Sequence, residues 1–381
     1  MYFQTLFSHT GTLTWIITGI AGAAFLTQGL IYLLVYLRCT RKSSMKQESA
    51  ETPPVSVVIC ARNEEENLRR FLPLVLEQDY PDFEVVVVDD CSTDDTGLLL
   101  AELTARYKRL RYTTITPDKK FTHGKKLALT VGIKSARHDI LLLTDADCYP
   151  GSENWIRGMT GGFSRGAGMV LGYGGYEKRK GLLNLLIRYE TVNTALRYLG
   201  YALKGYPVMG VGRNIAYRKE LFFANKGFAA HYHLASGDDD LFVNEVAGQT
   251  KVSVVFDPAS HTISLPKTGF RAWFVQKKRH VSAGRLYRKG ARLRIAADWI
   301  SSVLFYLPAL YLAVATDWHW LALGSWFLLT LLKSIILKLF MVRLDEKDLL
   351  LPSFLIEPLL PYIYFVIRAA QVFDPKPNQW S

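Results

Sequence analysis

The chain has 381 residues, of which 49% are hydrophobic and 21% are charged, and its formal net charge is +12 at pH 7. This composition excludes an intrinsically disordered protein, and the length suffices for one sizeable domain with additional segments. The apolar residues are concentrated in blocks, which indicates membrane segments beside a globular domain.

The first apolar block spans residues 15–37 and contains no charged residue. Its length suffices to cross roughly 30 Å of hydrocarbon, so we expect a transmembrane helix. A cleaved signal peptide is the alternative, but no Lys or Arg precedes the block. A basic cluster follows it, made of Arg38, Arg41, Lys42 and Lys46. By the positive-inside rule, residues 1–14 are extracytoplasmic, and the basic linker 38–53 begins the cytosolic part at the inner membrane.

Residues 54–264 are predicted to form one α/β domain. Strands are expected from residue 55 onward and at 84–90, 110–116 and 140–147, with amphipathic helices between them. This alternation favours a largely parallel, Rossmann-like sheet. No G-x-G-x-x-G follows the first strand and no G-x-x-x-x-G-K-[ST] occurs, so dinucleotide-binding and P-loop proteins lack their fingerprint here.

Two of the predicted strands end in pairs of aspartates. Asp89 and Asp90 follow four valines, and Asp145 and Asp147 follow the run ILLLT. Ligands of open α/β sheets bind at the carboxyl ends of the strands, so one shared crevice is expected. An isolated Asp-x-Asp also occurs in surface turns. On an extended segment, however, alternate carboxylates can share a hard divalent cation with diphosphate oxygens, which favours a nucleotide-diphosphate donor.

Residues 265–296 are predicted to form a basic amphipathic segment at the membrane surface. Ten Lys and Arg residues and no Asp or Glu lie between Lys267 and Arg294, and the segment also contains aromatic residues, Phe270, Trp273, Phe274 and Tyr287. This pattern is typical of binding to an anionic cytosolic leaflet. Nucleic-acid binding is the alternative for such a patch. The membrane segment directly after it argues against a nucleic-acid partner.

Residues 297–373 contain three more apolar segments, at 301–315, 320–337 and 349–367, for which we expect membrane crossings. The last segment contains Glu357 and several prolines, so a kinked or re-entrant hairpin is the alternative. Residues 374–381 are left as a C-terminal tail.

On these motifs, residues 54 to about 290 resemble the membrane-bound family 2 glycosyltransferases, the group of cellulose synthase, hyaluronan synthase and ceramide glucosyltransferase. The resemblance implies an α/β GT-A fold in the cytosol with transmembrane helices at both ends. It also implies a UDP-sugar donor and Mg²⁺ or Mn²⁺. The donor-binding residues that it implies are Ala61, Arg62, Asn63 and Glu64 of the A-R-N-E motif, Asp89 and Asp90, Lys125, Asp145, Gln276 and Arg279.

The resemblance further assigns the metal and the catalytic base. Asp147 looks like the principal metal ligand, together with Asp145. In the sequence ASGDDDLFVNEV, Asp239 best matches the base of inverting members, and Asp238 is the second choice. A triple aspartate can also be a solvated helix cap.

The acceptor side is assigned less directly. The segment VGRNIAYR resembles acceptor-lining segments of the family, so Gly212, Arg213 and Asn214 are candidates, with a buried turn as the competing account. His280 also belongs to this side. It stands where the family motif Q-x-x-R-W has a tryptophan.

We therefore expect an inverting glycosyltransferase that moves sugar from a UDP-sugar to a lipid or glycan at the cytosolic membrane face. The His280 departure favours single transfer onto a lipid. A processive polysaccharide synthase is one alternative. A non-catalytic, nucleotide-binding membrane scaffold is another.

Overall fold

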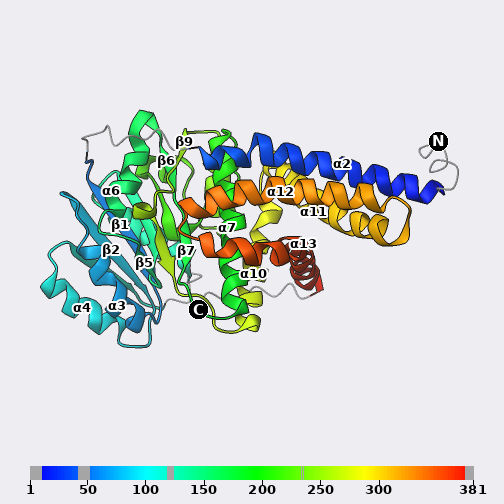
Figure 1. The fold of residues 1–381 in the computed structure, drawn as a ribbon. Coiled ribbons are helices and arrows are strands. Elements are labelled where there is room, and N and C mark those ends of the chain that lie inside the picture. Colours follow the sequence, from blue (N-terminus) through cyan, green and yellow to red (C-terminus); the bar gives the residue numbers. More distant parts are fainter. Residues whose placement is uncertain (1–10, 42–51, 118–123, 233, 235, 374–381) are drawn as a thin grey trace.

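The computed structural model describes residues 11–41, 52–117, 124–232, 234 and 236–373. An α/β domain occupies one end of the molecule, and long helices extend from it on one side (Figure 1). Parts of the expected N-terminal stretch 1–14 and of the linker 38–53 lie outside the described residues, as do Lys42, Lys46 and the tail 374–381.

The main sheet has seven strands in the order β3-β2-β1-β4-β8-β6-β9. They are β1 (Val55–Ala61), β2 (Phe83–Asp90), β3 (Leu110–Ile115), β4 (Ile140–Asp145), β6 (Met169–Leu171), β8 (Ile215–Arg218) and β9 (Val252–Val254). The predicted strands β1 to β4 run parallel, as expected. β8 runs antiparallel to both β4 and β6. The sequence did not predict this reversal, because a strand of four residues carries too little periodicity.

The continuous apolar runs of the strands follow from burial of both faces of the sheet. Helices α3 (Glu65–Leu76), α4 (Thr96–Arg106) and α6 (Trp155–Thr160) cover one face, and α5 (Lys125–Ser135) covers the other. Every residue of β1 and β2 is buried. Val57 belongs to the core under α3 and α4, and its neighbour Val58 to the core under α5.

A second, three-stranded sheet has the order β5-β10-β7. Its strands are β5 (Cys148–Pro150), β7 (Gly174–Tyr176) and β10 (Thr262–Ser264). β5 follows β4 after a turn of two residues, Ala146 and Asp147. The shorter remaining elements are η2 (Gly161–Gly166), η3 (Gly212–Asn214), α8 (Lys219–Ala224), η4 (Ala229–His231), α9 (Asp240–Val246) and η5 (Pro258–Ser260).

Helix α7 (Leu182–Leu203) connects the α/β domain with the long helices. It packs into the same core as Tyr36 and Cys39 from η1 (Tyr36–Thr40) and as Phe340 from α12 (His319–Arg343). The sequence did not reveal this helix, because its buried residues lie all around it instead of along one stripe.

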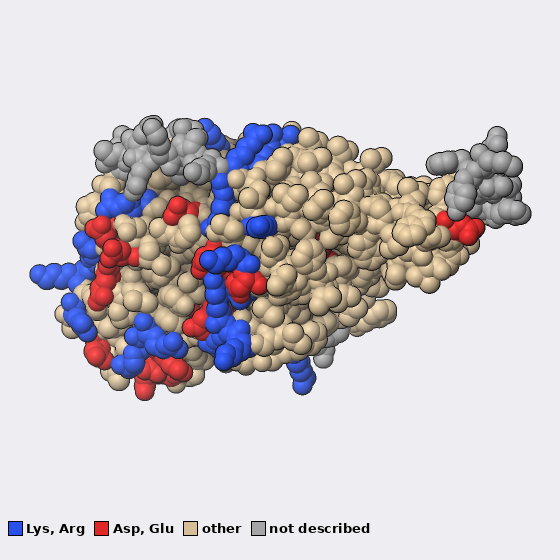
Figure 2. Space-filling view, in the orientation of Figure 1, with Lys and Arg blue, Asp and Glu red and all other residues tan. Residues whose placement is uncertain are grey.

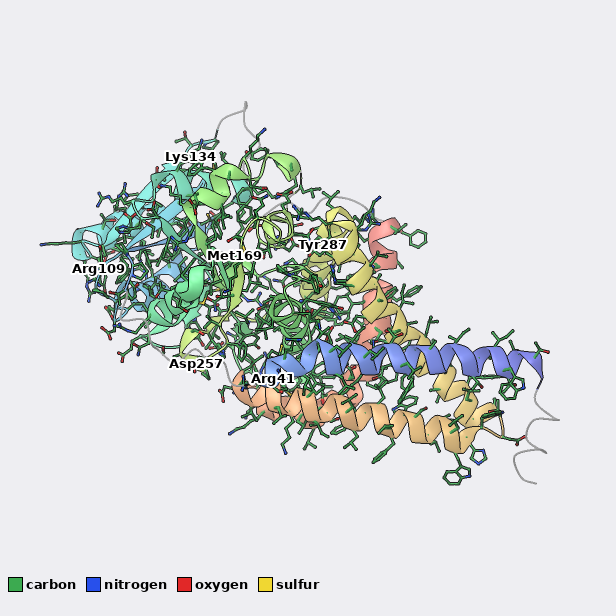
Figure 3. The ribbon with its side chains drawn as sticks, turned by 90° about the horizontal axis from the view of Figure 1, so that it is seen from above. Arg41, Arg109, Lys134, Met169, Asp257 and Tyr287 are labelled. Atoms are coloured by element: carbon green, nitrogen blue, oxygen red, sulfur yellow. The ribbon has the colours of Figure 1, made fainter. Side chains whose placement is uncertain are left out.

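Within the described residues, four helical segments are long and apolar enough to cross a membrane, judged by length and composition. They comprise α2 (Thr12–Leu34) with η1, α11 (Lys289–Ala315), α12, and α13 (Leu350–Phe373) with η7 (Lys347–Leu349). α2, α11 and α12 run side by side, and Arg41 marks the end of this bundle nearest the α/β domain (Figure 3).

The segment 265–296 is not one continuous element. It comprises α10 (Phe270–Ala283), η6 (Gly284–Leu286) and the first turns of α11. Two of its aromatic residues are packed inside the protein, and the placement of the segment at a membrane surface stays a prediction. Trp273 is buried against Ile187 and Ile367, and Tyr287 is buried in the main core.

Helix α13 leaves the direction of the bundle and packs against α10 (Figures 1 and 3). Ile363 and Ile367 of α13 belong to one apolar cluster with Trp273 and Phe274 of α10. Two prolines lie inside α13, and a proline inside a helix removes a hydrogen bond and causes a kink. The path of α13 relative to a bilayer stays a prediction.

Buried polar side chains tie α7 to the long helices. Arg197 Nε donates to Asp298 Oδ2 of α11 at 2.9 Å, and Tyr36 OH donates to the same oxygen at 2.6 Å. Glu357 of α13 accepts from Tyr189 OH at 2.6 Å. Glu357 also pairs with Lys333 Nζ of α12 at 2.7 Å. These contacts fix the helices to the α/β domain through one shared element.

The Lys333–Glu357 pair gives a first testable prediction. We expect Lys333→Met to lower the midpoint of thermal unfolding in detergent, because removing one partner of a buried ion pair costs about 3–5 kcal/mol. Adding Glu357→Leu should recover most of the loss, since no uncompensated charge then stays buried. Lys338→Met is the control, because Lys338 is exposed on the same helix. Equal unfolding midpoints for Lys333→Met and Lys338→Met would contradict a stabilising role of the Lys333–Glu357 pair.

Candidate active site

The carboxyl ends of β1, β2 and β4 lie level with one another. The register pairs Ala61 with Asp89 and Cys60 with Asp145. Asn63 has a left-handed backbone (φ 55°), which asparagine tolerates better than most residues. Its Oδ1 accepts from the N–H of Thr93 at 2.8 Å, so it joins the loop after β1 to the loop after β2.

A cavity of about 1330 Å³ opens beside these strand ends and extends to α10, α11 and α13. This is more than the roughly 300–1,000 Å³ of a typical small-molecule pocket, so two ligands have room in it. Eleven predicted site residues line it: Glu64, Lys125, Asp145, Asp147, Gly212, Arg213, Asp238, Asp239, Gln276, Arg279 and His280.

The other predicted site residues do not line the cavity. They are Ala61, Arg62, Asn63, Asp89, Asp90 and Asn214. Asp89 is buried, and its Oδ1 accepts from the N–H of Ser92 at 3.2 Å, which holds the turn after β2. The donor-binding roles expected for this turn and for the turn after β1 stay predictions.

The structure contradicts the expectation that Asn214 lies on the acceptor side. The residue is completely buried. Its Nδ2 donates to the backbone oxygens of Tyr173 and Ser260 at 2.7 and 2.8 Å, and its Oδ1 accepts from Trp155 Nε1 at 3.0 Å. All polar atoms of the side chain therefore form hydrogen bonds inside the core. This agrees with the alternative interpretation, in which the segment is a buried turn.

Asp145, Asp147 and Cys148 form a group whose candidate ligand atoms lie within 4.8 Å of one another. Burial and the nearby carboxylate of Asp145 raise the pKa of Asp147, so a cation between the two carboxylates would remove an unfavourable interaction. Burial raises the pKa of the Cys148 thiol well above its ordinary value, which makes it a poor ligand. The two carboxylates fit a hard divalent cation that keeps positions open for phosphate oxygens.

Lys125 connects this acidic pair with the predicted base. Its Nζ lies 2.7 Å from Asp145 Oδ1 and 3.0 Å from Asp238 Oδ2. Burial acts to lower the pKa of Lys125, but Asp145, Asp238 and Asp239 outweigh it, and the pKa is well above its ordinary value. Lys125 therefore stays charged and holds the two acidic segments together.

The three consecutive aspartates have different surroundings. Burial acts to raise the pKa of Asp238, but Lys125 and other neighbouring groups together outweigh it and lower the pKa. Asp239 Oδ2 accepts from the N–H of Gly212 at 2.6 Å, and its Oδ1 accepts from the N–H of Asp240 at 2.7 Å. Burial and Asp238 raise the pKa of Asp239. Asp239 caps the N-terminus of α9 and also lines the cavity, so the same residue serves as a helix cap and as part of the candidate site.

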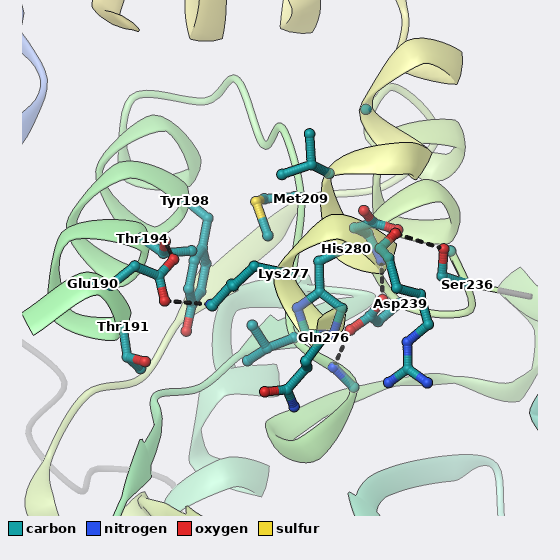
Figure 4. Close-up of a pocket in the computed structure, with 18 of the residues that line it drawn as sticks. Glu190, Thr191, Thr194, Tyr198, Met209, Ser236, Asp239, Gln276, Lys277 and His280 are labelled. Atoms are coloured by element: carbon teal, nitrogen blue, oxygen red, sulfur yellow. Dashed lines mark hydrogen bonds and ion pairs between the residues drawn. The ribbon is translucent and has the colours of Figure 1, made fainter. Parts of the chain in front are cut away.

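Helix α10 forms the opposite wall. Gln276 and His280 lie one turn apart and point into the cavity, as does Asp239 from the other side (Figure 4). Lys277 forms an ion pair with Glu190 of α7. His280 is exposed on the cavity wall, and the protein around it, together with Lys277 and Arg279, lowers the pKa of its imidazole well below the ordinary value.

Arg213 lies against the backbone of β7. Its Nε and Nη2 donate to the carbonyl oxygen of Gly174 at 3.0 and 2.7 Å. A Cβ at position 174 would lie 2.5 Å from Arg213 Nε, so this approach requires glycine. Glu190 and Lys277 also line the cavity and were not predicted from the sequence. A lone glutamate in an unrecognised helix gives no signal, whereas Lys277 lies inside the Q-x-x-R motif and could have been found.

The mixed sheet and the Asp-x-Asp turn after β4 define the class of the protein, which is the GT-A fold of glycosyltransferases. A solved structure with this fold is the mannosyltransferase PcManGT from Pyrobaculum calidifontis in complex with GDP-Man and Mn²⁺. It has a TM-score of 0.57 and 20% identity, over 90% of this chain and 98% of that chain.

Residues 56–223 match the family model described as glycosyl transferase family 2, which supports a family 2 glycosyltransferase. It is 26% identical over 287 residues to a probable glycosyltransferase, YdaM, of Bacillus subtilis, which is 72% of this chain and 65% of that protein. It is 31% identical over 110 residues to a beta-monoglucosyldiacylglycerol synthase of Nostoc sp., which is 28% of this chain and 23% of that protein. The matches thus span less than two thirds of either relative.

Asp240 gives a second testable prediction. Burial and Asp239 raise its pKa to about 8, whereas an unfolded aspartate has a pKa of about 3.9. The folded protein therefore binds this proton more tightly, and the resulting stability is complete below a pH of about 4 and is lost as the pH rises towards 8. Since asparagine stays neutral, we expect the thermal unfolding midpoint to fall less for Asp240→Asn than for the wild type as the pH rises from about 4 to about 8.

The measurement is thermal unfolding in detergent at a series of pH values. Asp95→Asn is the control, because Asp95 is exposed and makes no side-chain capping hydrogen bond. The control should follow the wild-type pH dependence. If the curve of Asp240→Asn ran parallel to that of the wild type, Asp240 would not titrate in this range.

Proposed function

We propose that the chain is an inverting glycosyltransferase that moves one sugar from a UDP-sugar to a lipid acceptor at the cytosolic face of the cell membrane. The observation that carries this proposal is the continuity of the cavity. It runs from Asp145 and Asp147 at the sheet to Trp299 and Arg368 on helices that are long and apolar enough to cross a membrane.

The donor would bind at the inner end of the cavity. Asp145 and Asp147 would hold Mg²⁺ or Mn²⁺, which, when bound, neutralises negative charge on the departing diphosphate. Lys125 and Arg279 are cations that line the cavity from opposite walls and would contact the phosphates, as would Gln276. Because PcManGT was solved with GDP-Man and Mn²⁺, a GDP-sugar is the alternative donor.

Asp239 is the proposed base. As the acceptor oxygen attacks the anomeric carbon and the bond to the diphosphate breaks, the acceptor proton moves to a carboxylate oxygen of Asp239. The backbone N–H groups of Gly212 and Asp240 orient this carboxylate. Its raised pKa makes it a stronger base than an ordinary aspartate. Asp238, the second choice, is engaged by Lys125 and is therefore less suited to accept a proton.

The lining of the cavity favours single transfer over extrusion of a polymer. It includes residues of α10, α11 and α13 but none of α2 or α12. Phe305, Tyr306 and Leu329 fill the space between the long helices. A polymer channel through the bundle would have to displace this core, whereas a lipid can enter from the side.

Charge distribution supports the cytosolic orientation. Lys and Arg gather along the junction between the α/β domain and the long helices, which are otherwise nearly uncharged on the face shown (Figure 2). At the far end, the described residues 11–20 and 316–318 contain Asp317 and no Lys or Arg. By the positive-inside rule, the junction then faces the cytosol.

The function is tested by measuring nucleotide release from the purified protein with a lipid extract, across UDP- and GDP-sugars. We expect release that a chelator abolishes and that Mn²⁺ or Mg²⁺ restores, with one sugar–lipid product by mass spectrometry. Chains of many sugars would support the processive alternative. Nucleotide binding without release under any condition would support the scaffold.

The base is tested by Asp239→Asn. We expect at least about a hundredfold loss of transfer, the lower end of what a general base contributes, with UDP affinity nearly unchanged. Asp95→Asn should retain wild-type transfer. In the wild type, the raised pKa of Asp239 should place the acidic limb of the pH–rate profile above that of an ordinary aspartate, because only the deprotonated form accepts the proton. Unchanged transfer by Asp239→Asn would exclude Asp239 as the base.

A further inference from the structure

Charge is sorted along the length of the cavity. The acidic lining residues come from the α/β domain and α7: Glu64, Asp145, Asp147, Glu190, Asp238, Asp239 and Asp240. The lining residues from α10, η6, α11 and α13 include no Asp or Glu. The part of the cavity near the long helices is therefore basic, whereas the part near the sheet is acidic.

We define the basic mouth as Arg285, Lys289, Arg292 and Arg368, which line the cavity and are exposed. The first three lie on η6 and the first turns of α11, and Arg368 lies near the end of α13. In the described part of the chain, no carboxylate forms an ion pair with any of them. Arg368 lies over the ring of Trp299, 5.0 Å from its centroid. Four cations that form no ion pair with a described carboxylate favour a bound anion.

Apolar side chains surround the same opening. Leu293 and Val372 line it and are 70% and 63% exposed. Trp299 stacks on Phe365 with ring centroids 6.4 Å apart, and its Nε1 donates to the backbone oxygen of Pro361 at 2.9 Å. Tryptophan with a polar contact is typical of the boundary between a membrane and water. A ligand that satisfies both features carries an anionic group and an apolar chain.

We propose that the basic mouth binds the anionic group, a phosphate or a carboxylate, of an amphiphilic lipid acceptor that enters sideways between α11 and α13. The proposal rests on the proposed function, since it names the chemical class of the acceptor. The anionic group contacts Arg292 and Arg368, the apolar chain stays beside Leu293 and Val372, and the acceptor hydroxyl extends towards Asp239. Neutral glycerolipids lack the group that these cations recognise.

The test measures binding apart from turnover. The full-length protein in neutral detergent is titrated with dioctanoyl phosphatidate, dioctanoylglycerol and inorganic phosphate, and binding is followed by native mass spectrometry. We expect dioctanoyl phosphatidate to bind at least about tenfold more tightly than dioctanoylglycerol, which corresponds to about 1.4 kcal/mol. Arg292→Gln combined with Arg368→Gln should remove that preference and leave UDP affinity unchanged.

The matched control is Arg271→Gln. Arg271 is an exposed cation on α10 that does not line the cavity, so its loss should leave the preference intact. If Arg271→Gln lost the preference for the anionic lipid to the same extent, the preference would come from general attraction by the basic surface, and the proposed site would be refuted. Equal binding of the anionic and neutral lipids would do the same, and equally tight binding of inorganic phosphate would refute a lipid ligand.

Turnover is then measured separately. If the anionic lipid binds with the expected preference but no lipid acceptor yields a glycosylated product with any donor, the proposed function fails while the binding site stands. If a neutral lipid is glycosylated and the anionic one does not bind, the proposed function stands and the basic mouth has no role in acceptor recognition.

Discussion

The arrangement of the whole molecule depends on the polar contacts that α7 makes on its membrane side. Arg197 meets Asp298 of α11, and Tyr189 meets Glu357 of α13. In addition, Arg188 Nε donates to Glu346 just before η7 at 3.0 Å. These groups are largely withdrawn from water, so each has a large cost if its partner moves away. The long helices therefore cannot shift independently of the α/β domain.

The same helix forms part of the cavity wall, through Glu190 and Tyr198. Glu190 pairs with Lys277 of α10 and accepts from Tyr364 of α13, so it bridges the two elements that bound the outer cavity. At the inner end, Lys125 performs the corresponding task between Asp145 and Asp238. Two ionic bridges thus tie the walls of one cavity together, one beside the sheet and one beside the long helices.

The sequence predicted those parts whose physical cause is local. Strands buried on both faces require continuous apolar runs, so β1, β2 and β4 and their acidic ends could be found. The parts that it missed depend on tertiary contacts. Helix α7 is buried on most sides and shows no amphipathic stripe. For Asn214, the sequence around an asparagine does not distinguish one that is buried in the core from one that lines a binding site. Trp273 looked like a membrane-surface residue because sequence alone cannot tell burial in protein from burial in lipid.

The sorting of charge along the cavity bears on how often one acceptor can be extended. A lipid held by its anionic group at the basic mouth places its reactive hydroxyl at a fixed distance from that group. Once a sugar is added, the new terminal hydroxyl lies one sugar further on, beyond the position of the base. A neutral His280 in the wall, where the family motif has a broad indole, offers a smaller surface on which a lengthened glycan can stack. On the proposed binding mode, a second transfer would require the anionic group to leave Arg292 and Arg368, which favours one addition for each lipid bound.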